Sequence, residues 1–134
     1  MRWIGARAPS LDVFETVARE AYERLPDSFR ALSRDIVFRI DEFPTDEVLD
    51  ALGIDNEFDL LGLYQGWPLG SRSVADPPSL PDMIFLYRRP ILDYWAEHDD
   101  SLDHIIIHVL VHEIGHHFGL SDADMEAIEL SVEA

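Results

Sequence analysis

The stretch at residues 102–122, LDHIIIHVLVHEIGHHFGLSD, constrains the chain more than any other. Its apolar residues recur at helical spacing, so we expect a helix over roughly 102–118. His112 and His116 are four residues apart, so on a helix they lie on one face and can reach a single zinc ion. Glu113 projects beside them and can take a proton from a water on the metal without being a ligand. The stretch therefore predicts a buried helix that carries a candidate metal site.

The residues after this helix complete the pattern H-E-x-x-H-x-x-G-x-x-D. Gly119 can adopt the left-handed conformation that ends a helix and reverses the chain. The reversed chain can bring Asp122 to the metal as a third ligand, and Asp124 is the alternative if the turn is longer. The competing interpretation is a buried helix whose histidines are satisfied by hydrogen bonds, and the five-residue pattern argues against it.

The other residues near the pattern are expected to lie outside the metal site. His117 points away from His112 on the helix, which favours a place in the core or at the rim. His108 comes one turn before His112, and we expect a partly buried histidine with a hydrogen-bond partner; a place in the cavity wall is the alternative. Met125 is expected to be a core contact.

The remaining periodicity predicts an α+β domain. We expect helices at about 11–25, 46–52 and 123–131, helical turns at 27–33 and 91–98, and strands at 35–43, 60–65 and 83–88. The expected fold is one domain over residues 1–134, in which residues 1–9 are a loose lead-in and a small sheet covers the long helix, with flanking helices.

One strand and the stretch after it are candidates for contacting a substrate. Gly62, in the strand at 60–65, is either a bulge or a point where another backbone approaches closely. Residues 66–82 contain two glycines and four prolines. Such a long irregular stretch is usually functional or mobile, and this one could fold over a cleft.

Charge and composition limit the partners. The formal net charge of −17 argues against nucleic acid or an anionic membrane, because binding phosphate requires a basic surface. The chain has no cysteine, which excludes disulfides and thiolate ligands and suits a reducing compartment. No apolar run resembles a signal peptide or a membrane span, so we expect a cytoplasmic protein.

The segment HEIGHHFGLSD resembles the active-site helix of the zincin metallopeptidases, and its aspartate resembles that of snapalysin-like enzymes. With the strands LLGLYQG and MIFLYRRP before the helix, the chain is similar to the bacterial minimal-zincin family of metallopeptidases over roughly residues 10–131. The resemblance implies a mixed sheet packed on helices, one zinc ion per chain on His112, His116 and Asp122, and Glu113 as the base. Asp122 stands where the larger metzincins have a third histidine.

The expected reaction is zinc-dependent hydrolysis of peptide bonds in flexible or unfolded polypeptide. One alternative is hydrolysis of another small amide, and another is a non-catalytic zinc-binding regulatory protein on the same scaffold. Retention of Glu113 counts against the regulatory protein, because structural zinc needs ligands but no base. The sequence does not indicate an oligomeric state.

The substrate is expected to add as a strand to a sheet edge, as zincins generally hold peptides. We favour the strand at 60–65, beside Gly62 and Tyr64, over the strand at 83–88. Four residues are candidates for stabilising the oxyanion, although a structural role is the alternative for each: Tyr64, Tyr87, Arg88 and Tyr94.

Overall fold

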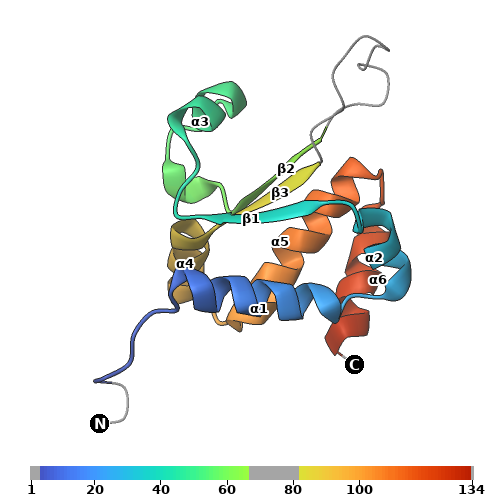
Figure 1. Cartoon of the computed structure of the whole chain (residues 1–134), viewed down its shortest axis with the longest axis horizontal. Helices are drawn as coiled ribbons and strands as arrows, with labels where there is room; N and C mark the ends of the chain where they lie inside the picture. The colour runs from blue at the N-terminus through green and yellow to red at the C-terminus, as the bar shows by residue number, and fades with distance from the viewer. Residues whose placement is uncertain (1–3, 67–81, 134) are drawn as a thin grey trace.

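A long helix and a three-stranded sheet organise the chain (Figure 1). The computed structural model describes residues 4–66 and 82–133. The elements in chain order are α1 (Leu11–Glu23), α2 (Asp27–Ser33), β1 (Val37–Asp41), α3 (Asp46–Leu52), η1 (Glu57–Asp59), β2 (Gly62–Gln65), β3 (Met83–Tyr87), α4 (Arg88–Glu97), α5 (Leu102–His117) and α6 (Asp122–Glu133). The expected α+β class is confirmed. Most of the Pro-rich stretch, at 67–81, lies outside the described residues. The expectation that this stretch could fold over a cleft falls on these residues and stays a prediction.

The sheet is mixed, with strand order β1-β3-β2. β1 runs parallel to β3, and β2 runs antiparallel to it, with Gly62 opposite Leu86. The central strand β3 buries Ile84 and Leu86 almost completely, as expected for alternate residues that face the helices. All three strands fall within the segments that alternation predicts.

Helix α5 occupies the centre of the molecule and contacts α1, α4, α6, β2 and β3. In Figure 1, α1, α5 and α6 lie on one side of the sheet and α3 lies on the other. The buried residues of α5 are Ile105, Ile106, Ile107, Val109, Leu110, Val111, Ile114 and Gly115. A helix surrounded in this way is apolar on most sides, and its histidines, Asp103 and Glu113 are the polar exceptions.

The ends of the helices follow local sequence signals. The Ser10 hydroxyl caps α1 by accepting from the Val13 N–H, and Thr45 does the same for α3. The expected turn at 91–98 is instead the full helix α4, which begins at Arg88 directly after β3. Pro90 lies in its first turn, where a missing N–H costs no helical hydrogen bond.

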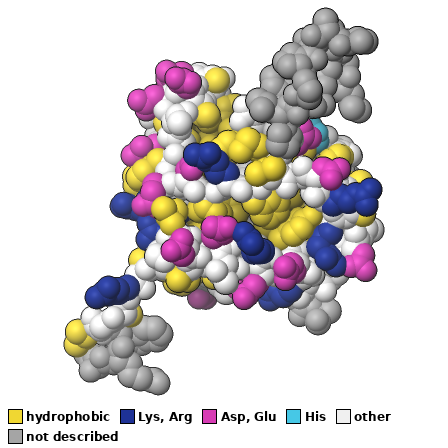
Figure 2. All heavy atoms as spheres, viewed as in Figure 1, with side chains coloured by type: hydrophobic (Ala, Val, Ile, Leu, Met, Phe, Trp, Pro, Cys, Tyr) yellow, Lys and Arg dark blue, Asp and Glu magenta, His cyan; other side chains and the backbone are white. Residues whose placement is uncertain are grey.

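One face of the molecule carries an apolar band between β1 and α1 (Figure 2), where Val37 and Leu11 are exposed. Across the described residues, no helix combines the length and the apolar character needed to cross a bilayer.

Candidate metal and catalytic site

Three histidines lie on one face of α5 at successive turns: His108, His112 and His116. The ring centroids of His108 and His112 are 4.1 Å apart, and those of His112 and His116 are 5.6 Å apart. The His112 ring is therefore adjacent to a second imidazole on either side.

Glu113 follows His112 and is half-buried. Removal of its carboxylate from water raises the pKa of Glu113, while a hydrogen bond from the Tyr64 backbone N–H and the charge of His116 lower it. Burial is the largest of these effects, so the net pKa is raised. A carboxylate with a fixed donor and a raised pKa is suited to accept and return a proton.

The turn after α5 reverses the chain. Gly119 has φ +74°, and the Leu120 N–H donates to the Gly115 carbonyl at 2.9 Å. This hydrogen bond and the left-handed glycine form the Schellman arrangement that closes a helix. The reversal sends α6 back along α5.

Gly115, inside the sequence pattern, lets α6 approach closely. A Cβ atom on Gly115 would lie 2.6 Å from the Met125 sulfur, and Met125 is fully buried. Met125 is therefore a core contact, as the sequence predicts. On α6, residues 122, 125 and 129 share one face, so the contact at Met125 turns that face toward α5.

Asp122 is the first residue of α6 and is exposed. Because it precedes Met125 by one turn, and α6 runs back along α5, it lies toward the end of α5 that carries His116. Its role as a ligand stays a prediction. Asp124, the alternative ligand, forms a reciprocal cap instead: its N–H donates to the Ser121 hydroxyl and its carboxylate accepts from the Ser121 N–H.

Glu129 is the residue that the sequence analysis missed. Its Oε1 is 2.6 Å from His108 Nδ1, and its Oε2 is 3.5 Å from His112 Nε2. Within the described residues, these three side chains form a group whose ligand atoms all lie within 4.8 Å of one another. The seven-residue spacing from Asp122 to Glu129 is a signal that could have placed both carboxylates on one helix face.

A polar cluster of Tyr64, Asp82 and His117 lies next to the motif. The Tyr64 ring stacks on His117 with centroids 4.0 Å apart, and its hydroxyl donates to Asp82 Oδ2 at 2.8 Å. Burial and the Asp82 carboxylate raise the pKa of Tyr64 well above its ordinary value, so the phenol stays neutral. His117 is exposed at the rim.

Gly62 packs closely against the Val109 side chain of α5. A Cβ atom there would lie 2.5 Å from Val109 Cγ1 and 3.0 Å from the Phe85 carbonyl oxygen. The space beside Gly62 is therefore filled by the Val109 side chain of α5 and by the Phe85 carbonyl of the neighbouring strand β3, and only a residue without a side chain fits there. The strand register through Gly62 is continuous, so no bulge is present in β2.

The other oxyanion candidates have structural partners. Tyr87 is buried, and burial together with the charges of Asp41 and Glu113 raises its pKa to about 12. Arg88 donates to the Pro9 carbonyl and to the Glu42 carboxylate. Tyr94 stacks on His98.

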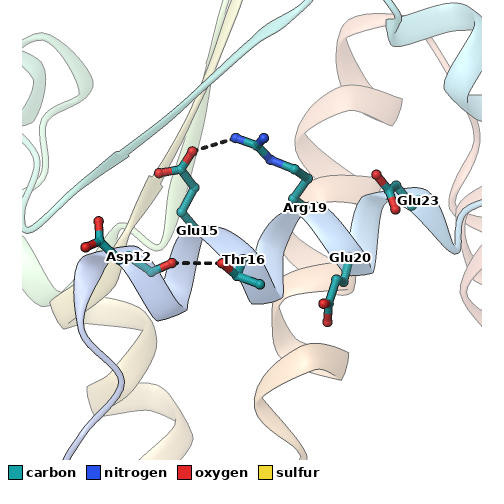
Figure 3. A pocket seen from close by; sticks show the side chains of 6 residues that line it. All are labelled: Asp12, Glu15, Thr16, Arg19, Glu20 and Glu23. Carbon is teal, nitrogen blue, oxygen red and sulfur yellow. Dashed lines mark hydrogen bonds and ion pairs between the residues drawn. The ribbon is translucent and has the colours of Figure 1, made fainter.

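A shallow hollow on the outer face of α1 has no comparable chemistry (Figure 3). Its Glu15 carboxylate pairs with Arg19 at 2.6 Å, and both side chains are mostly exposed. An exposed pair four residues apart on a helix is a common surface feature and gives no reason to place a site there.

The sequence model of the zincin-like metallopeptidases matches residues 33–132. The match covers most of the chain and includes the sheet, α5 and α6. Comparison of the chain with curated proteins gives no match.

Proposed function

The chain belongs to the zincin-like metallopeptidase family, and on that basis we propose that it is a zinc-dependent endopeptidase acting on flexible or unfolded polypeptide. One observation carries the proposal: Glu113 lies between the histidine face of α5 and strand β2, and its carboxylate accepts from the Tyr64 backbone N–H. This arrangement provides a base beside a strand edge.

The proposed zinc ligands are His112, His116 and Asp122. Two imidazole nitrogens and one carboxylate are a donor set that zinc accepts, and three protein ligands are the usual number in catalytic zinc sites. When bound, zinc polarises the scissile carbonyl and lowers the pKa of a coordinated water to about 7.

Glu113 is the proposed general base. It accepts a proton from the attacking water and then delivers that proton to the nitrogen of the leaving amine. The Tyr64 N–H faces the carboxylate and lowers its pKa, while the larger effect of partial burial raises the pKa and makes the carboxylate a better proton acceptor.

Strand β2 is the proposed platform for the substrate. Within residues 4–66 and 82–133, β2 pairs with β3 on one side only. The Tyr87 N–H donates to the Leu61 carbonyl. Successive residues of an antiparallel strand direct their N–H and C=O groups alternately toward and away from the neighbouring strand, so those of Gly62 and Tyr64 point away from β3. A peptide that adds to this edge would pass beside Glu113 and be held by main-chain hydrogen bonds to Gly62 and to the Tyr64 carbonyl, since the Tyr64 N–H already faces Glu113. Main-chain hydrogen bonds of this kind tolerate many sequences.

A bacterial, cytoplasmic setting is part of the proposal. It draws on the resemblance to bacterial minimal zincins and on a cysteine-free sequence that suits a reducing compartment.

Digestion of an unfolded protein by the zinc-loaded chain, with fragments identified by mass spectrometry, tests the proposal. We expect cleavage of the unfolded substrate, slower cleavage of its folded form, and loss of both after chelation. Glu20→Gln, which makes the same change on the exposed face of α1, is the matched control for Glu113→Gln and should cut normally. Fragments that form equally with Glu113→Gln would reject the proposed base.

A further inference from the structure

The four-residue repeat of histidines on α5 creates two overlapping pairs that share His112. The pair of His112 and His116 belongs to the proposed catalytic site. The pair of His108 and His112 has the same spacing and faces Glu129 of α6. Glu129 is the carboxylate that lies beside the second pair, whereas Asp122, on the same face of α6, is only the proposed carboxylate of the first pair.

We infer that His108, His112 and Glu129 form a second metal site, which shares His112 with the proposed catalytic site and holds a divalent ion in an inactive position. The inference rests on the proposed function for its catalytic site. Its own support is the convergence of three ligand atoms within 4.8 Å.

The geometry is close to what a zinc-like ion requires. At ligand distances of 2.0–2.1 Å, tetrahedral coordination separates ligand atoms by about 3.4 Å. The separation of Glu129 Oε2 and His112 Nε2 is 3.5 Å, whereas Glu129 Oε1 and His108 Nδ1 are 2.6 Å apart. Entry of an ion therefore requires the His108 ring to move away from its hydrogen bond with Glu129, while the separation of Glu129 and His112 is already close to the tetrahedral value.

The exposures of the side chains permit this movement. The His108 side chain is 56% exposed and can adjust, while that of Glu129 is 13% exposed and is held by the packing of α6. Met125, one turn earlier on α6, is fully buried against Gly115, which fixes the distance between the two helices at this point.

The second site lacks a base between its two histidines. Glu113 follows His112 in the catalytic pair, whereas Val109 follows His108 in the equivalent position. An ion on His108, His112 and Glu129 would have two imidazoles and a carboxylate, with Glu113 one residue beyond the second histidine of the pair rather than between the two histidines. A neutral imidazole offers its ring nitrogen to one ion at a time, so occupation of this site withdraws His112 from the catalytic set.

Cobalt titration of metal-free protein tests the inference, with visible absorption and calorimetric stoichiometry as readouts. His116→Ala breaks the catalytic pair and should still bind one Co²⁺. Adding Glu129→Gln or His108→Ala to His116→Ala should weaken Co²⁺ binding at least about tenfold. This is a lower bound, because replacing a residue that is only hydrogen-bonded to a metal ligand already lowers metal affinity by about that factor. His98→Ala in the same background removes an exposed imidazole outside α5 and should change nothing.

The outcomes separate this inference from the proposed function. Failure of His116→Ala to bind Co²⁺ overturns the second site, as does binding that neither Glu129→Gln nor His108→Ala weakens. Tight binding by His112→Ala overturns the sharing of that residue. The proposed catalytic ligands are tested independently by His108→Ala alone, which should bind one Co²⁺; loss of binding there would count against them. Circular dichroism of each metal-free variant verifies that it is folded.

Discussion

The backbone N–H of Tyr64 donates a hydrogen bond to the carboxylate of Glu113, which joins strand β2 to the motif face of helix α5. The two residues are far apart in sequence, and the contact depends on β2 lying alongside α5. It places the proposed base beside a sheet edge.

Burial of Glu113 should reduce the stability of the metal-free protein at neutral pH. A raised pKa means that the folded state binds the proton more tightly than the unfolded state does. The stability that Glu113 contributes is therefore fully present below its unfolded pKa of about 4.3, and is lost as pH rises through its folded pKa.

We accordingly expect metal-free Glu113→Gln to unfold at a higher temperature than the wild type at pH 7, and the difference to close toward pH 4. Thermal unfolding followed by circular dichroism measures this. Glu20→Gln, at an exposed position, should follow the wild type throughout. A variant less stable than the wild type at pH 7 would mean that the charged Glu113 side chain is favoured by the fold.

Tyr64→Phe distinguishes a structural hydroxyl from an oxyanion donor. The substitution removes the hydrogen bond to Asp82 and keeps the ring that stacks on His117, so unfolding should become easier by about 0.5–1.5 kcal/mol. The backbone bond to Glu113 is untouched, so kcat should change by only a few fold. A 100-fold fall in kcat with unchanged stability, roughly 2.7 kcal/mol of transition-state stabilisation, would instead place the hydroxyl in the reaction.

Gly62→Ala should destabilise the fold, because the added methyl group would overlap Val109 and crowd the Phe85 carbonyl. Overpacking of this kind costs about 1–3 kcal/mol, measurable by urea unfolding. Adding Val109→Ala should recover part of the loss. Gly5→Ala is the matched control, since a Cβ atom there meets nothing within 4 Å. If Gly62→Ala were as stable as Gly5→Ala, the close packing of β2 on α5 would be wrong.

Local patterns were sufficient to predict most elements. Alternation at Ile84 and Leu86 indicates a strand that is half buried on the helices, and Thr45 with Gly53 marks both ends of α3. The strand order and the parallel pairing of β1 with β3 were not predictable from such patterns, because they depend on contacts between distant segments. The helix α4 begins at Arg88, earlier than the expected turn at 91–98, because Pro90 is tolerated in the first turn of a helix.

The candidate site likewise combines features that local sequence patterns predict with features that depend on contacts between distant segments. The spacing of His112, Glu113 and His116 specifies one helical face by itself. The position of Glu129 opposite His108 depends on how closely α6 packs on α5, which Gly115 and Met125 determine. The packing of Gly62 likewise requires knowledge of the strand's neighbour, and the sequence alone allowed either a bulge or a close approach.

The most direct test of Glu113 as the base is the cleavage rate of an unstructured peptide by wild type and Glu113→Gln at equal, measured zinc content. Glu113 is not a proposed ligand, so the variant should keep one zinc ion per chain. Its kcat should fall by at least about 100-fold, the lower end of what general acid–base catalysis contributes. Equal rates at equal zinc content would contradict the proposed role of Glu113.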